Sequence, residues 1–212
     1  MVMLEPGLLM AVRADIDRWE RPVAWMYLDS LGNVTVGAGL KLATPGQAGQ
    51  LPFHHEGSGK SASPGEIGKV WKTLNAGAQK QKSAALSKKF SADHYSNDSD
   101  LRIDQTFFDG YRDQHINADY YELKNIYRSF DDFPENAKRA LFDMIYNLGA
   151  GRIASGHHPA SGLRRFSAMN AAIDAGRWEI AAKLSLRHGI PAERNRWTAD
   201  LFRSCATQMA GR

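Results

Sequence analysis

The chain begins with apolar residues that recur at the spacing of one helix face. They lie within 8–20, at Leu8, Leu9, Val12, Ile16 and Trp19. This spacing predicts an amphipathic helix that packs against a core. Pro22 disfavours helical geometry in the residue before it, so the helix should end near Glu20.

The pattern then changes to alternation. Residues 24–28 (AWMYL) and 34–40 (VTVGAGL) stand on either side of a glycine-bearing turn, which predicts an antiparallel hairpin. Successive side chains of a strand point to opposite faces. Val34 and Val36 should therefore face the core of a small lobe, which leaves Thr35 to face a cleft or solvent.

Helical periodicity dominates the second half. The clearest helix is 134–149, which opens with Pro134, closes with Gly149 and carries an apolar stripe over about four turns. An aromatic-rich helical pattern covers 104–130. Three more amphipathic segments are expected around 163–175, 178–188 and 191–207.

At 212 residues the chain suits one domain with two lobes around a cleft. We expect a small β-containing lobe at about 21–62. A larger helical lobe should come from 1–20 and 104–212, and together the two lobes make an α+β fold. The lysine- and serine-rich residues 76–100 lose apolar periodicity, and we interpret them as a flexible insertion with room for one short helix.

Composition excludes several classes of protein. With 43% hydrophobic and 24% charged residues, the chain can build a core and is not globally disordered. No apolar run approaches the ~20 residues that span a bilayer, so stable membrane insertion is not expected. The N-terminus lacks a basic start and is interrupted by Glu5 and Pro6, so we expect no signal peptide. The one cysteine, Cys205, rules out an internal disulfide and suits a small core position.

The basic excess, a formal charge of +4 with a pI of about 9.2, favours nucleic acid, lipid headgroups or an acidic cell-wall polymer as partners. Much of it comes from 69–89 (KVWKTLNAGAQKQKSAALSKK), within which the lysine cluster at 80–89 could touch nucleic acid. Phe90 and Tyr95 alone make a poor platform for stacking bases, so nucleic acid is not expected. The histidine pairs at 54–55 and 157–158 lack the helical spacing of a zinc motif, so we expect no metal site.

Two carboxylates flank the first strand. Glu20 lies at a helix C-terminus, where the macrodipole disfavours negative charge, and near Trp19 and Trp25, so it has reasons to hold a proton. Asp29, at an open turn, should stay ionised. A protonated acid facing an ionised base suits glycoside cleavage. Equally, Asp29 could simply close an Asx-turn, and Thr35 could be a surface residue of its strand.

Eight residues separate Glu20 from Asp29, and five separate Asp29 from Thr35. Asp29 and Thr35 lie within the pattern Y-x-D-x-x-G-x-x-T-x-G-x-G, which Glu20 precedes. This motif resembles the active-site hairpin of phage-type lysozymes, glycoside hydrolase family 24. ALFDMIYNLG is similar to the central helix of that family, AAIDAGRWEIAAKL to the helix pair after it, and ERNRWTADLF to its C-terminal arginine-bearing helix. The resemblance covers roughly 8–42 and 130–203 and implies a lysozyme-like fold.

The resemblance also implies roles in catalysis. Glu20 would be the general acid, Asp29 the base or water-orienting carboxylate, and Thr35 the residue that positions the attacking water. The family inverts the anomeric centre, which requires space for a water between the two carboxylates, ~6.5–9.5 Å apart. No cofactor is needed.

Three further residues match binding positions of the family. Arg194 matches the arginine that approaches the catalytic glutamate, and its charge would lower the pKa of Glu20, against the effect of the helix end. Tyr146 and Asn147 match cleft-facing positions of the central helix and would contact sugars, although helix surface or core is an equal alternative. Leu40 stands where the family usually has a histidine, so a structural ion pair of the family should be missing.

These observations favour a monomeric muramidase that hydrolyses peptidoglycan. A non-catalytic cell-wall or receptor-binding module on the same fold, and a basic nucleic-acid-binding domain, are the alternatives. The enzyme could be a phage endolysin or an antibacterial effector with an immunity protein and a secretion machinery. We expect synthesis in the cytoplasm and action on the cell wall after delivery by a holin or a secretion system.

Overall fold

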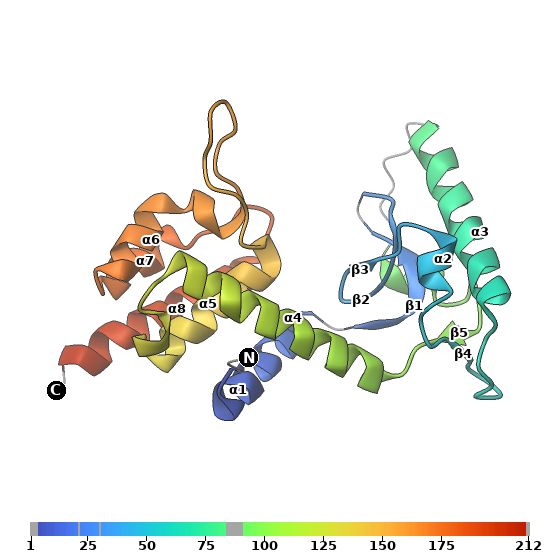
Figure 1. The fold of residues 1–212 in the computed structure, drawn as a ribbon, viewed down its shortest axis with the longest axis horizontal. Helices are drawn as coiled ribbons and strands as arrows, with labels where there is room; N and C mark the ends of the chain where they lie inside the picture. Colours follow the sequence, from blue (N-terminus) through green and yellow to red (C-terminus); the bar gives the residue numbers. More distant parts are fainter. Residues whose placement is uncertain (1–3, 21, 30, 84–90, 211–212) are drawn as a thin grey trace. The chain divides into compact units, whose positions relative to one another are not determined.

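The protein divides into two compact units. We call Met1–Trp19 with Arg112–Arg212 the helical unit and Glu20–Tyr111 the sheet unit. The computed structural model describes residues 4–20, 22–29, 31–83 and 91–210 (Figure 1). These described residues form eight α-helices and two small antiparallel sheets, so the predicted α+β class is confirmed.

The helical unit combines the N-terminal helix with the second half of the chain. Its elements are α1 (Pro6–Trp19), the later part of α4 (Gln105–Ile126), the short 3₁₀ helix η2 (Phe130–Asp132), α5 (Glu135–Leu148), the 3₁₀ helix η3 (Gly162–Arg165), α6 (Ser167–Asp174), α7 (Trp178–Leu184) and α8 (Ala192–Ala210). The helices predicted at 8–20 and 134–149 are confirmed. α5 ends before Gly149, which has a φ of 68° that other residues rarely adopt.

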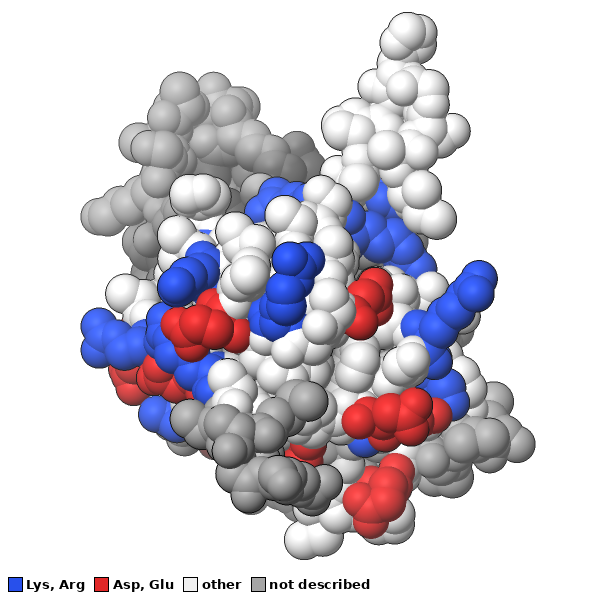
Figure 2. All heavy atoms as spheres, turned by 90° about the vertical axis from the view of Figure 1, so that its left-hand side faces the viewer, with Lys and Arg blue, Asp and Glu red and all other residues white. Residues whose placement is uncertain are grey.

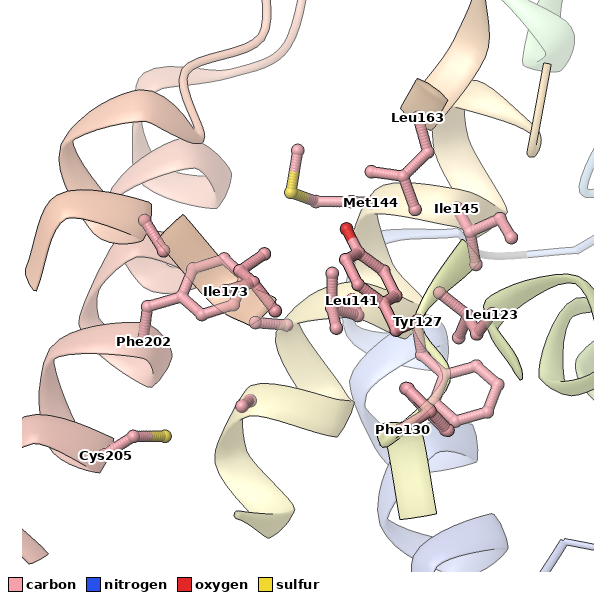
Figure 3. Packing of buried hydrophobic residues seen from close by; sticks show 14 of the residues in the cluster. Leu123, Tyr127, Phe130, Leu141, Met144, Ile145, Leu163, Ile173, Phe202 and Cys205 are labelled. Carbon is pink, nitrogen blue, oxygen red and sulfur yellow. The ribbon is translucent and has the colours of Figure 1, made fainter. Parts of the chain in front are cut away.

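The core of the helical unit forms around α5, whose apolar positions are buried along one stripe: Ala137, Ala140, Leu141, Met144 and Ile145. α5 packs against α1 and α8. Figure 3 shows how Leu141, Ile173 and Phe202, from three different helices, contribute to the same cluster. Cys205 is buried in α8, in agreement with the core position expected for it.

A long loop projects from the helical unit between α5 and η3 (Figure 1). At its tip, Ser155 and His158 exchange two backbone hydrogen bonds of 3.0 Å. At its base, Gly151 and Gly162 approach each other closely. A Cβ on Gly151, at its φ of +75°, would lie 1.8 Å from the carbonyl oxygen of Ser161. The base of the loop therefore requires glycine.

The sheet unit contains two small sheets. Its elements are β1 (Val23–Leu28), β2 (Val34–Gly37), β3 (Leu40–Lys41), α2 (Pro45–Ala48), β4 (His54–His55), α3 (Pro64–Ser83), the 3₁₀ helix η1 (Ala92–Tyr95), β5 (Leu101–Arg102) and the start of α4. β1, β2 and β3 form one antiparallel sheet in that order, and β4 pairs with β5 in the other. α3 packs against β1 and β2, and a core cluster includes Val34 and Val36. The predicted hairpin is therefore present, with the valines in the core.

The sheet unit extends well beyond the predicted small lobe at 21–62. Residues 76–83, part of the segment interpreted as a flexible insertion, continue α3, and Ala78 is buried. Tyr95 of η1 is also buried, and Trp25 donates a 2.9 Å hydrogen bond to the carbonyl of Ala92. The interpretation as an insertion is thus wrong for 76–83 and 91–100, because single apolar residues anchor these parts without a repeating stripe. Residues 84–90 lie outside the described residues.

Candidate active site

The sheet unit holds the three residues expected to perform catalysis. Glu20 follows the end of α1 and precedes β1, and it is half-buried. Asp29 directly follows β1 and is also half-buried. Thr35 lies within β2, which pairs with β1. The predicted acid and base therefore flank a single strand, and the third residue lies on the strand beside it.

Asp29 organises the turn between β1 and β2. Its Oδ1 accepts hydrogen bonds from the backbone nitrogens of Leu31, at 2.9 Å, and Asn33, at 2.8 Å. Its Oδ2 accepts a 2.9 Å hydrogen bond from Nδ2 of Asn33. The bond to Leu31, two residues on, is that of an Asx-turn. The structural role considered for Asp29 is therefore present, and Oδ2 retains capacity for a further donor.

The surroundings of Asp29 favour its ionised form. Burial acts to raise the pKa of Asp29, but the hydrogen bonds from Asn33 and Leu31 and the charge of Lys41 outweigh it, so the pKa lies below its usual value. Lys41 of β3 stands directly opposite Thr35. An ionised Asp29 agrees with the sequence-based expectation and with the requirement for a base.

Tyr27 is affected by the charges of both carboxylates. Burial raises the pKa of its phenol, and the negative charges of Asp29 and Glu20 raise it further, so both carboxylates lie within electrostatic range of one hydroxyl. The Tyr27 hydroxyl donates a 3.4 Å hydrogen bond to the carbonyl of Gly37. Sequence reasoning did not select Tyr27. The Y-x-D spacing was the available signal, because residues two apart share one face of a strand.

Thr35 is more enclosed than expected. It stands opposite Tyr27 in the ladder, on the face away from the core valines, as alternation predicted. Yet it is only 1% exposed, because both faces of β2 are covered, so the prediction that it could face solvent is wrong. Its hydroxyl donates a 3.1 Å hydrogen bond to the carbonyl of Asn33. The oxygen can still accept a hydrogen bond from a water.

The three predicted binding residues belong to the helical unit. Arg194 of α8 is buried, and its Nε donates a 2.8 Å hydrogen bond to Oδ1 of Asp143. The other carboxylate oxygen of Asp143 accepts from Arg187, at 2.7 Å, and from the hydroxyl of Thr198, at 2.7 Å. Arg194 is therefore held by a buried network that sequence reasoning missed. The signal was an aspartate within the apolar stripe of α5.

Tyr146 and Asn147 lie near the end of α5 and are half-buried. The ring of Tyr146 packs on that of His115 of α4, with 4.8 Å between centroids and an angle of 31°. His115 was not selected from the sequence, since a lone histidine in an aromatic-rich helix carries no motif. The half-buried positions suit side chains at the edge of the core.

The histidine pairs do not form a metal site in the described part of the chain. His55 Nδ1 lies 2.9 Å from Oδ2 of Asp100, and its Nε2 lies 3.7 Å from Oε1 of Glu66. This cluster ties β4 to the start of α3. Among the described residues, no three His, Cys, Asp or Glu side chains gather in an arrangement for a metal ion.

Both signs of charge share the described surface. On the face drawn in Figure 2, basic and acidic side chains are interspersed and form no patch of one sign. Surface ion pairs such as Arg203 with Asp200, at 2.6 Å, contribute to this mixture. Within the residues that the structure covers, no helix combines the length and apolarity that a membrane crossing needs.

The six predicted site residues thus fall into two groups of three, one in each unit. Glu20 and Asp29 lie before and after β1 of the sheet unit, and Thr35 lies within β2. Tyr146, Asn147 and Arg194 lie on α5 and α8 of the helical unit. No protein-family model, curated protein or solved structure matches the chain.

Proposed function

We propose that this protein is a muramidase that hydrolyses the β-1,4 bond between N-acetylmuramic acid and N-acetylglucosamine in peptidoglycan. The observation that carries the proposal is the position of Glu20 and Asp29 at the two ends of β1, both within electrostatic range of Tyr27. A lowered pKa at Asp29 supplies the ionised member of an acid/base pair.

The two carboxylates would act on opposite sides of the scissile bond. Glu20 gives its proton to the bridging oxygen as the bond from that oxygen to the anomeric carbon breaks. Asp29 takes a proton from a water whose oxygen attacks the same carbon from the opposite face. One water is consumed, both products are released as free sugars, and the anomeric configuration is inverted.

The remaining residues would position the reactants. Thr35 keeps lone pairs for a water near Asp29, and its hydroxyl orientation is fixed by the bond to Asn33. Within the helical unit, Tyr146 and Asn147 would offer an aromatic face and an amide to a sugar. Arg194 is buried and its guanidinium binds Asp143, so it would act within the helical unit and not as an exposed charge beside the glycan. No cofactor takes part in this chemistry.

Clearing of purified peptidoglycan tests the proposal. Wild-type protein should reduce the turbidity of the suspension, whereas Glu20→Gln and Asp29→Asn should not, with little change in melting temperature. Glu56→Gln is a matched control, because Glu56 is an exposed carboxylate of the same unit that pairs with Arg102 at 2.7 Å. Normal clearing by a folded Glu20→Gln protein would remove Glu20 from the mechanism.

A non-catalytic cell-wall-binding module is the second candidate. It is favoured by the structural bonds of the proposed site, because Asp29 closes an Asx-turn and Thr35 donates to the backbone. Such a module would sediment with insoluble peptidoglycan without clearing it, and Glu20→Gln would bind equally. Clearing by wild type and not by Glu20→Gln would exclude it.

The cellular target can be tested separately from the chemistry. A muramidase should be nearly harmless when it is confined to a bacterial cytoplasm and lytic when it is fused to an export signal. Glu20→Gln should be harmless in both compartments. Equal killing with and without export would point to a cytoplasmic target. Delivery by a holin or by a secretion machine, with an immunity protein in the second case, belongs to the same proposal.

A further inference from the structure

Asp119 of α4 is a buried acid with an unsatisfied oxygen. Its side chain is only 9% exposed, and Nε2 of His115, one helical turn earlier, lies 3.6 Å from its Oδ2. Among the described residues, this buried Oδ2 accepts no hydrogen bond. An unpaired buried oxygen costs on the order of 1–3 kcal/mol, so the arrangement requires an explanation.

The surroundings of Asp119 and His115 favour a state in which the carboxyl of Asp119 holds a proton and the ring of His115 is neutral. Burial raises the pKa of Asp119 to about 7, and the negative charge of Glu122 adds to the effect. Arg164 of η3 binds Glu122 at 3.2 Å. Burial lowers the pKa of His115. Near neutral pH a protonated Oδ2 is therefore a donor that faces the acceptor Nε2, and the 3.6 Å between the two atoms must shorten by about 0.5 Å to form a hydrogen bond.

His115 is the exposed member of this pair. Its side chain is 42% exposed, and its ring packs at 4.8 Å from that of Tyr146 on α5. Because Asp119 faces Nε2, the nitrogen open to a ligand is Nδ1, which makes no hydrogen bond within the described residues. An aromatic pair with one free ring nitrogen offers both a stacking face and a directional polar group.

We propose that His115 contacts the glycan beside Tyr146 and that Asp119 is its positioning residue, whose carboxyl decides which nitrogen of His115 carries the proton. This inference rests on the proposed function, in which Tyr146 binds a sugar. The ligand class is an acetamido sugar, whose ring stacks on an aromatic face. Its carbonyl or hydroxyl oxygen accepts a hydrogen bond from Nδ1–H of His115.

The proposal has a defined pH dependence. When Asp119 is protonated, Oδ2–H donates to Nε2, so the proton of the neutral ring is on Nδ1 and can be donated to the sugar. When Asp119 is ionised, it accepts from Nε2–H, and Nδ1 becomes an acceptor. Binding of an acetamido sugar should therefore weaken as the pH rises through the range where Asp119 loses its proton.

Calorimetry with tri-N-acetylchitotriose tests this without turnover in the full chain carrying Glu20→Gln. Affinity should fall about fivefold from pH 6 to pH 8, the effect of one hydrogen bond. Asp119→Asn should bind as at pH 6 across the range, because its amide donates permanently to Nε2. Asp119→Ala should bind weakly at both pH values. Asp200→Asn, at an exposed acid of α8, should behave as the unmodified chain does.

Nitrogen NMR of His115 separates a positioning role from a merely structural one. The Nδ1–H tautomer should dominate at pH 6 and in Asp119→Asn, and the trisaccharide should shift the signals of His115. Persistence of the pH dependence in Asp119→Asn, or His115 signals unchanged by the sugar, would overturn the inference. If wild type fails to clear peptidoglycan, the proposed function fails alone, since binding and tautomer are measured independently of hydrolysis.

Discussion

Nη2 of Arg187 donates a 2.7 Å hydrogen bond to Oδ2 of Asp143, and both side chains are buried. Because Oδ1 of the same carboxylate also binds Arg194, at 2.8 Å, one negative charge holds two arginines inside the helical unit. A buried arginine without a counter-ion is strongly destabilising. Asp143 therefore helps to hold both guanidinium groups in place.

Asp143→Ala should destabilise the protein by ~3–5 kcal/mol, because it removes the buried carboxylate that both guanidinium groups bind. Thermal or urea unfolding measures this loss. Asp200→Ala is the control, since Asp200 pairs with Arg203 but is 59% exposed, and it should cost less than ~1 kcal/mol. Similar losses for the two variants would show that the Asp143 network does not support the helical unit.

Asn33→Ala should raise the pKa of Asp29, because it removes the side-chain hydrogen bonds to both carboxylate oxygens. The stability that Asp29 gains from these bonds is present above its usual pKa and is lost as pH falls through its lowered pKa. Carbon NMR of Asp29 measures the shift. The acid limb of the rate profile should move to higher pH, because the base must be ionised. Lys41→Ala should cause a smaller shift, and an unchanged Asp29 in both variants would contradict this account.

Hydrolysis should release the α-anomer first if Asp29 activates a water. The attack on the anomeric carbon then comes from the face opposite the leaving oxygen, and a β-linkage gives an α-product. Proton NMR of freshly formed products, recorded before mutarotation, measures the outcome. Initial β-anomer would mean retention of configuration and a covalent intermediate, and Asp29 would then be a nucleophile.

Asp119→Asn should flatten the dependence of stability on pH. The pKa of Asp119 is about 7 in the folded protein against 3.8 in the absence of burial, so the folded state holds this proton more tightly. The contribution of this proton to the free energy of unfolding is fully present below pH ~4. It is lost as pH rises towards 7, and it amounts to at most ~4 kcal/mol. Melting temperatures between pH 4 and 8 measure the slope. Equal slopes for wild type and variant would show that Asp119 ionises normally.

Gly151→Ala should destabilise the projecting loop by more than ~2 kcal/mol, because the added Cβ would meet the carbonyl of Ser161. Gly156→Ala is matched, since Gly156 also has a positive φ, of +53°, but has nothing within 4 Å of the added carbon. It should cost only ~1 kcal/mol, from backbone strain alone. Hydrogen exchange of the loop amides compares the two variants. Equal protection in both would contradict a close-packed base.

Periodic patterns were enough to predict α1, α5 and the first hairpin, because a repeating apolar stripe specifies both the element and its buried face. The same reasoning failed for 76–83 and 91–100. There Ala78 and Tyr95 are each buried as an isolated apolar residue. One buried residue produces no repeating pattern from which a helix could be predicted. Alternation placed Thr35 on the correct face, but a pattern along one strand does not reveal what covers that face.

Polar partners across the chain were also beyond sequence reasoning. Asp143 and Arg187 are 44 residues apart, and nothing in either local sequence identifies the other. Asp29 and Asn33 are close in the chain, and a turn was predicted there, so their contact was easier to predict from the sequence. The candidate carboxylates could be selected from spacing and resemblance, whereas the contacts that support them could be identified only in the three-dimensional structure.

Cys205 is a natural probe for local unfolding of the helical unit. It is the single thiol of the chain, and it is buried in α8, where it donates to the carbonyl of Leu201 at 3.3 Å. A thiol reagent can reach it only when α8 separates from the core, and burial also raises its pKa, which keeps it in the unreactive thiol form. The rate of labelling at this one atom therefore measures how often the helical unit opens.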